Sequence, residues 1–462
     1  MNILTTPRVV NREDIQGIVA SGYDHLDYSR FVFLEIKDPG ATRKWLTSIV
    51  PLITNARHPG DNKAGFCLNL AFSLKGLEKL VPALLQGFPH EFDRGMKTDD
   101  ANLVLGDRNE SDWEYGARIQ PDLNVLVILY GSTPKELDSL HGKVTGSPEF
   151  SQGLCILAEQ DSVIPPGDET EPFGYRDGLS QPLVQGLLGR GKPTESLINT
   201  GEFVLGYENE LGLLTQIPSI ENWADPLGYL ADHPSTPGKR AFGLNGTYLV
   251  FRKLIQKVDE FRDYIHNSAS EPNERERNAA KIVGRWRSGA PLVLSPDSPG
   301  SEPRNDFLFM ETDPDGTVCP IGAHIRRANP RDSLDMPPSR SILISRRHRL
   351  LRRGRKFSLP TKESTKDSPK NEQGLYFIVL NADLRRQYEF VQQQWINDPS
   401  FNGLDNDRDP LVGDNSGGEF TIQAKPINRH LRGLPQFVVM KGGGYFFLPG
   451  LRALGFLASY CP

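Results

Sequence analysis

The sequence predicts an α+β protein built as a duplicated α+β sandwich. Segments rich in β-forming residues alternate with segments whose apolar residues recur at helical spacing. Each half of the chain contains about four such strands and two main helices, in a similar order. Because the chain has 462 residues, it is long enough for more than one domain. We expect one domain over residues 1–205 and a second over residues 206–462.

The first half begins with a strand and then a helix. Residues 28–36 are rich in β-formers, and apolar residues then recur at helical spacing between Ala41 and Ile53. Further strands are expected at residues 67–72, 123–130 and 153–157. Ser73 is placed to cap the helix that follows it, and Thr133 to Glu136 form a capping box with Pro134 in the first helical position.

The second half repeats this order. Strands are expected at residues 247–253, 375–380, 436–440 and 445–447, the last two on either side of three consecutive glycines. Apolar residues at helical spacing follow the first strand, from Val258 to Ile265, and the second, from Leu384 to Trp395. Residues 161–171, 189–199 and 361–373 are polar or rich in Pro and Gly, and we expect loops there.

Composition excludes several function classes. The formal net charge is −5, which does not favour a nucleic-acid partner, and no apolar run is long enough to predict a membrane span or a signal peptide. The four cysteines, Cys67, Cys155, Cys319 and Cys461, are scattered and form no CxxC pair. This favours reduced thiols, and we expect a cytoplasmic protein.

Three short clusters are candidates for chemistry. In Gly174-Tyr175-Arg176-Asp177-Gly178, two glycines hold one carboxylate in a tight turn. The alternative is a plain surface turn, since Asp-Gly is a common turn dipeptide. In residues 321–331, His324 lies among small and apolar neighbours and is followed by arginines that bind carboxylates well. The alternative is a structural histidine.

The third cluster, residues 345–356, carries a run of arginines. One interpretation is a solvated basic face. The other is a nucleic-acid-binding patch, which is disfavoured because no aromatic residues lie between the charges. The nine histidines form no HxH, HxxxH or HExxH pair, which argues against a typical zinc site. GxGxxG after a strand, GxxxxGK[ST] and GxSxG are absent.

Together these clusters resemble the dye-decolourising peroxidases, in the larger cyanobacterial and fungal-like branch. Residues 174–178 are similar to the GxxDG signature of that family, the GAHIRR segment around His324 to its haem-ligand motif, and residues 350–354 to the segment that bears its distal arginine. Segments at Asp14, Trp286, residues 392–401 and residues 443–449 also resemble family segments, so the resemblance covers nearly the whole chain.

The resemblance implies two ferredoxin-like halves, with haem b between the sheet and the helices of the second half. His324 is then the axial iron ligand, Asp177 the acid and base for hydrogen peroxide, and Arg352 the group that stabilises charge as the O–O bond breaks. Arg331 is a candidate for a haem propionate. The donors are dyes, phenolics or other small aromatic compounds, and because carboxylate bases titrate in the acidic range, dye oxidation is expected to favour acidic pH.

The sequence alone leaves some assignments open. The distal arginine is Arg352 or Arg353, because the segment after it reads Arg355-Lys356-Phe357 where the family has an aromatic-glycine pair after a proline. Asp398 is a candidate by position for the carboxylate that orients His324. Tyr388 and Trp395 share a helical face, which is typical of core packing, the alternative being an electron relay. The alternatives to a peroxidase are a haem carrier with incidental peroxidase activity and a structural protein without haem.

Overall fold

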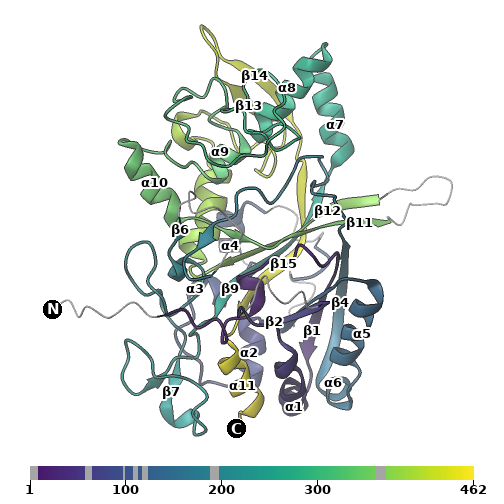
Figure 1. Ribbon diagram of the computed structural model, residues 1–462, viewed down its shortest axis with the longest axis vertical. Coiled ribbons are helices and arrows are strands. Elements are labelled where there is room, and N and C mark those ends of the chain that lie inside the picture. Colours follow the sequence, from purple (N-terminus) through teal and green to yellow (C-terminus); the bar gives the residue numbers. More distant parts are fainter. Residues whose placement is uncertain are drawn as a thin grey trace.

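The computed structural model describes residues 9–57, 65–96, 99–107, 113–116, 123–187, 197–360 and 371–461. These residues form a nine-stranded sheet in the order β10-β12-β9-β15-β2-β3-β1-β4, with β11 (Arg355–Pro360) paired to β12. Helices cover its outer faces, as Figure 1 shows. The protein is therefore a mixed α+β fold, as the sequence predicts.

The first half has the element order strand-helix-strand-strand-helix-strand. It contains β1 (Tyr28–Ile36), α1 (Pro39–Ile49), β2 (Phe66–Phe72), β3 (Val125–Gly131), α5 (Pro134–Thr145) and β4 (Leu154–Val163). All its pairs are antiparallel, and the strands lie side by side as second, third, first and fourth. This is the ferredoxin-like arrangement.

The second half repeats this order of strands. It contains β9 (Thr247–Gln256), α7 (Val258–Asn267), β10 (Leu351–Arg352), β12 (Asn371–Asn381) and β15 (Val438–Leu448). Its strands lie in the order β10-β12-β9-β15, again second, third, first and fourth. The halves meet where β15 pairs with β2 at Phe447 and Phe72. The duplication is thus present in the sheet, while the domain boundary near residue 205 stays a prediction.

The inward faces of the two halves pack against each other. Phe31 of β1 and Phe251 of β9 have ring centroids 5.3 Å apart, and Phe251 also stacks on Tyr376 of β12 at 5.9 Å. Successive side chains of a strand point to opposite faces. The neighbours of these aromatic residues, including Arg252 and Phe377, therefore point to the outer face of the second half, where the main cavity lies.

The remaining helices complete the outer layers. They are α2 (Leu74–Leu80), α3 (His90–Arg94), α4 (Asp99–Leu105), α6 (Pro148–Gly153), α8 (Pro272–Val283), α9 (His324–Ala328), α10 (Pro338–Arg347) and α11 (Leu451–Ser459). A two-stranded ribbon, β13 (Gly418–Ile422) and β14 (Arg429–Leu434), lies near α8 and α9 in Figure 1. The described residues contain no helix long and apolar enough to cross a bilayer.

The two helix caps predicted in the first half are confirmed. Ser73 Oγ accepts from Gly76 N at 3.1 Å, and Thr133 Oγ1 accepts from Glu136 N at 3.2 Å, so both predicted caps form. The strand expected at residues 153–157 is longer than predicted, because β4 runs through its polar second half to Val163. Of the loops expected from sequence, residues 189–196 and 361–370 lie outside the described residues.

Two predictions for the second half are wrong in detail. The glycines at 442–444 do not separate two strands, because β15 continues through them with a register shift between Met440 and Gly442. Glycine tolerates such a bulge. The helix expected from Leu384 to Trp395 is instead two short π-helical segments, Arg385–Glu389 and Val391–Ile396.

Candidate active site

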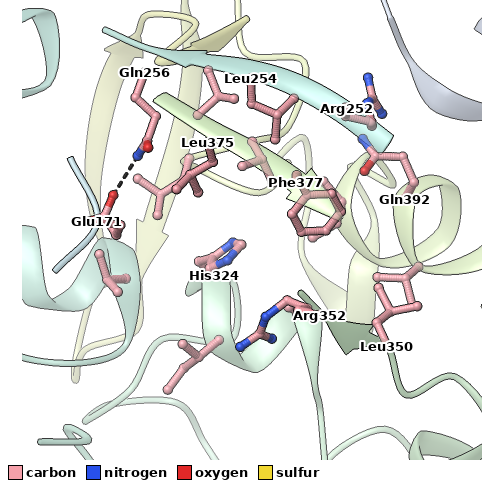
Figure 2. A pocket seen from close by; sticks show the side chains of 18 of the residues that line it. Glu171, Arg252, Leu254, Gln256, His324, Leu350, Arg352, Leu375, Phe377 and Gln392 are labelled. Carbon is pink, nitrogen blue, oxygen red and sulfur yellow. Dashed lines mark hydrogen bonds between the residues drawn. The ribbon is translucent and has the colours of Figure 1, made fainter. Parts of the chain in front are cut away.

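One cavity of about 510 Å³ lies between the outer face of the second half and α9. Its wall includes the three residues for which the sequence predicts chemistry, Asp177, His324 and Arg352. Apolar side chains from β9, β12 and the π-helical segments complete it: Leu254, Leu375, Phe377, Val391 and Ile396. Figure 2 shows His324 and Arg352 facing the same space, beneath Leu375 and Phe377.

His324 is the first residue of α9, and its side chain is held from behind by a carboxylate. Its Nδ1 lies 2.8 Å from Asp409 Oδ2. The Asp409 side chain is fully buried, and its Oδ1 accepts from the backbone N–H groups of Leu411 and Val412. Because Nδ1 is engaged in this way, Nε2 is the ring nitrogen left for a ligand.

The charges of the two groups are coupled. Burial disfavours a charged imidazole, but the attraction and hydrogen bond of Asp409 outweigh it, so the pKa of His324 is raised. Burial likewise disfavours the carboxylate, but His324 and the backbone N–H group of Val412 outweigh it, so the pKa of Asp409 is lowered. The pair therefore favours an ionised carboxylate beside the histidine, which increases the basicity of the ring.

Asp398 was the wrong candidate for this partner. Its carboxylate accepts from the backbone N–H of Ser400, and its carbonyl accepts from Arg327 Nη2. Arg327 also donates to the carbonyls of Trp395 and Asp407, so this arginine fixes the loop that leads to Asp409. Sequence reasoning missed Asp409 because it lies 85 residues from His324, in a segment without a recognisable pattern.

Asp177 lies at the end of a tight hairpin, as the glycine pattern predicts. Gly174 and Gly178 have φ of +91° and +76°, a region that favours glycine. Asp177 N donates to the carbonyl of Glu169 at 3.0 Å, and its Oδ1 accepts from Gly178 N at 2.6 Å. The Asp177 side chain is otherwise exposed to the cavity, and its charge raises the pKa of His324, so the two groups interact.

Arg352 lies on β10, where strand alternation decides which arginine faces the cavity. Arg352 lines the cavity, and its charge lowers the pKa of His324. Arg353 points to the opposite side, where Nε donates to the carbonyl of Ile18 at 2.7 Å and Nη2 to that of Val19 at 2.8 Å. Burial there lowers the pKa of Arg353 to about 10.

Arg355 also points away from the cavity, since its Nη2 donates to the carbonyls of Gly22 and Tyr23. Other members of the basic run are paired rather than solvated: Arg346 contacts Glu210, and Lys356 contacts Asp168. The run is thus not a purely solvated face, because several of its side chains make contacts within the protein and two of its arginines, Arg349 and Arg352, line the cavity.

Arg331 lines the cavity but also makes structural contacts. Its Nη1 donates to the carbonyls of Asn305 and Phe307 at 2.9 Å, and its guanidinium lies 3.9 Å from the centroid of the Phe307 ring. The backbone of Arg331 has a φ of +55°, unusual for a residue with a side chain. These contacts hold the guanidinium at the cavity wall.

The two candidate relay residues are buried. Tyr388 is 2% exposed and Trp395 is 4% exposed, as core packing requires. Tyr388 OH also accepts from Arg252 Nη1 at 2.5 Å at the cavity wall. Among the described residues, no group of three or more His, Cys, Asp or Glu side chains is arranged to hold a metal ion.

No family model matches the chain. It is 29% identical over 472 residues to a dye-decolorizing peroxidase of Exidia glandulosa, covering 96% of this chain and 86% of that protein. It is 30% identical over 380 residues to the multifunctional dye peroxidase DyP2 of an Amycolatopsis species, covering 76% and 74%.

A solved structure is also similar to this chain over almost its full length. The fungal DyP-type peroxidase of Auricularia auricula-judae is 26% identical, with a TM-score of 0.77 over 98% of this chain and 100% of that one. The similarity to fungal enzymes over almost the full chain agrees with the larger branch. The sequence motifs, the duplicated fold and these relatives together show that the chain belongs to the dye-decolourising peroxidase family and is a peroxidase of this type.

Proposed function

We propose that the cavity binds haem b, and that His324, Asp177 and Arg352 reduce hydrogen peroxide there at the expense of small aromatic or dye donors. The observation that carries this proposal is that all three residues line one cavity while Arg353 and Arg355 do not. The names of the relatives, which describe dye oxidation, support the choice of donors.

The cavity fits a haem. It has the size of a cofactor site and a largely apolar wall, which suits a porphyrin. His324 presents a ring whose other nitrogen is tied to a carboxylate, the arrangement that orients a histidine ligand. Arg331 and Arg349 also line the cavity and supply positive charge for propionates.

When bound, the haem supplies the iron that binds peroxide and the electrons that break the O–O bond. Asp177 accepts the proton of the near peroxide oxygen and returns it to the far oxygen, which leaves as water. Arg352 stabilises the negative charge that develops on the departing oxygen. One hydrogen peroxide takes two protons and two electrons in all, the electrons from two one-electron donors, and gives two waters.

His324 is the residue that would hold the iron. The Asp409 carboxylate holds the Nδ1 proton and orients the ring, so Nε2 carries the lone pair. A more basic histidine donates more electron density to the iron, which is the second contribution of the protein to the reaction.

The spectrum before and after one equivalent of peroxide tests the proposal. The holoenzyme is expected to show a Soret band that shifts on mixing and recovers when a dye is added. A haem carrier would show the band without efficient turnover, and the same turnover in Asp177→Ala and Arg352→Ala as in the wild type. A structural protein would show no band after reconstitution with haem.

We further propose a cytoplasmic location, supported by four free cysteines, and a boundary between the two ferredoxin-like domains near residue 205. Recovery of the native protein mainly from a secreted or periplasmic fraction would contradict the location.

A further inference from the structure

The hairpin that carries Asp177 has the half-buried carboxylate of Glu171 at its centre. Residues 169–177 double back on themselves: Glu171 N donates to the carbonyl of Tyr175 at 2.9 Å, and Asp177 N to that of Glu169 at 3.0 Å. Inside this turn, Glu171 Oε2 accepts from Phe173 N and Oε1 from Tyr175 N, each at 2.9 Å. One side chain thus accepts two backbone N–H groups of the hairpin.

The same carboxylate ties the hairpin to the sheet. Gln256 is the last residue of β9, and its Nε2 donates to Glu171 Oε2 at 2.6 Å, the contact drawn as a dashed line in Figure 2. β9 also forms the wall of the cavity through Leu254 and Arg252. The Glu171–Gln256 contact therefore connects the loop of Asp177 directly to the strand against which a bound cofactor would lie.

Further contacts hold the outer sides of the hairpin. Lys356 Nζ donates to the carbonyl of Thr170 at 2.8 Å, and Arg287 Nη1 to that of Phe173 at 2.7 Å. These two cations bind backbone carbonyls, whereas Glu171 is the group that binds the backbone N–H donors inside the turn. Burial and the nearby charge of Asp177 raise the pKa of Glu171, although the three hydrogen bonds oppose this.

We propose that Glu171 is a positioning residue for Asp177, which fixes the Asp177 carboxylate relative to the cavity by joining both arms of its hairpin to β9. This inference rests on the proposed role of Asp177 as acid and base. A general base works only within hydrogen-bond reach of its proton. A displacement of about 1 Å costs on the order of 10²-fold in rate, so Glu171, which also lines the cavity, would control the peroxide step through the position of Asp177.

Glu171→Gln tests the inference with little change in shape. An amide has one acceptor oxygen, so its NH₂ group must face a backbone N–H or Gln256 Nε2, and two donors repel each other. Gln256→Leu is a milder second variant that removes only the tie to β9. Glu159→Gln is the matched control, because Glu159 also accepts a side-chain hydrogen bond, from His141, but lies on β4 and does not line the cavity.

Four readouts are measured on the holoenzymes: haem content with Soret position, the rate constant for reaction with peroxide, the KM for dye, and hydrogen exchange. Glu171→Gln is expected to lower the peroxide rate constant about 10- to 100-fold while the haem content, Soret position and KM stay unchanged. Gln256→Leu should also lower the peroxide rate constant, but by a smaller factor. Glu159→Gln should leave this rate constant unchanged. Hydrogen exchange of the peptide that spans residues 169–178 should increase in the first two variants alone.

The outcomes separate this inference from the proposed function. If Asp177→Asn is slow while Glu171→Gln reacts at the wild-type rate, Asp177 keeps its role and the positioning inference is wrong. If Asp177→Asn reacts with peroxide as fast as the wild type, the proposed role of Asp177 is wrong, and the positioning inference loses its basis. A Glu171→Gln protein that loses haem together with activity would show a structural role, and so would contradict positioning unless Gln256→Leu slows peroxide with full haem content.

Discussion

The imidazole of His324 and the carboxylate of Asp409 are joined at 2.8 Å between Nδ1 and Oδ2, across 85 residues of sequence. Asp409 is itself fixed by two backbone N–H groups, so it cannot turn away from the ring. This contact places the proton on Nδ1 and directs the lone pair of Nε2 away from the carboxylate. The ring nitrogen that we propose as the iron ligand is thus oriented by Asp409, a residue with no proposed contact to iron or peroxide.

Asp409→Asn is expected to weaken haem binding. The asparagine oxygen would keep the hydrogen bonds from the backbone N–H groups of Leu411 and Val412. The asparagine NH₂ group would then face Nδ1 of His324 and favour the tautomer with the proton on Nε2. Loss of such a carboxylate typically costs about 10- to 100-fold in metal affinity or activity. Haem titration of the apoprotein measures the change. Equal affinities for variant and wild type would show that the contact does not orient the ligand.

His324→Ala is expected to lose stable haem binding, or to shift the spectrum away from histidine ligation. The ring is the ligand in this account, and the cavity would then hold the porphyrin by packing alone. Haem content and the Soret position of the purified variant measure this, with His348→Phe as a control because His348 is stacked on Phe390 outside the cavity wall. A variant of His324 with the wild-type spectrum and haem content would remove this residue from the site.

Arg352→Leu is expected to lower the rate of the peroxide step, and Arg353→Leu is expected to lower the stability of the fold. Arg352→Leu should slow the peroxide step about 10²- to 10³-fold, as loss of a charge-stabilising donor does. Arg353→Leu should react at the wild-type rate but be less stable by about 1–3 kcal/mol, because it leaves the carbonyls of Ile18 and Val19 without their partner. Stopped-flow rates and urea unfolding separate the two. The opposite pattern would place Arg353 in the cavity.

Acid is expected to destabilise the protein partly through His348. Burial, with the charges of Arg386 and Arg347, lowers its pKa to about 4, whereas an unfolded histidine titrates near about 6.5. The folded state thus favours the neutral ring. This contribution is complete above about pH 6.5 and is lost as the pH falls towards 4.

The urea midpoint of the holoenzyme at pH 7 and at pH 5 measures this effect. His348→Phe keeps a ring against Phe390 and should show a smaller loss between the two values than the wild type does. An equal loss in both proteins would mean that His348 does not titrate in this range.

The sequence predicts the parts of this molecule that depend on local patterns. Alternation and helical spacing locate most strands of both halves but miss β10 and β11, which begin within the arginine-rich run. Gly174 and Gly178 reveal the tight turn at Asp177 because positive φ favours glycine. The π-helical segments and the uninterrupted β15 escape prediction, since a glycine run and a helical spacing are each compatible with more than one backbone.

The site residues outside these patterns could not be found in this way. The choice between Arg352 and Arg353 depends on which face of β10 meets the cavity, and one residue of register reverses the answer. Asp409 and Glu171 act through contacts with residues 85 positions away in each case, His324 and Gln256, so only the folded chain reveals them.

The peroxide reaction of Asp177→Asn tests the central claim most directly. The holoenzyme is mixed with hydrogen peroxide in a stopped-flow instrument, and the rate of the Soret change is measured from acidic to neutral pH. Asp138→Asn is the control, since Asp138 is an exposed residue of α5. The account predicts that Asp177→Asn, with unchanged haem content, is slower by about 10²- to 10⁴-fold, and that the control is not. A wild-type rate in Asp177→Asn would contradict the assignment of Asp177 as the base.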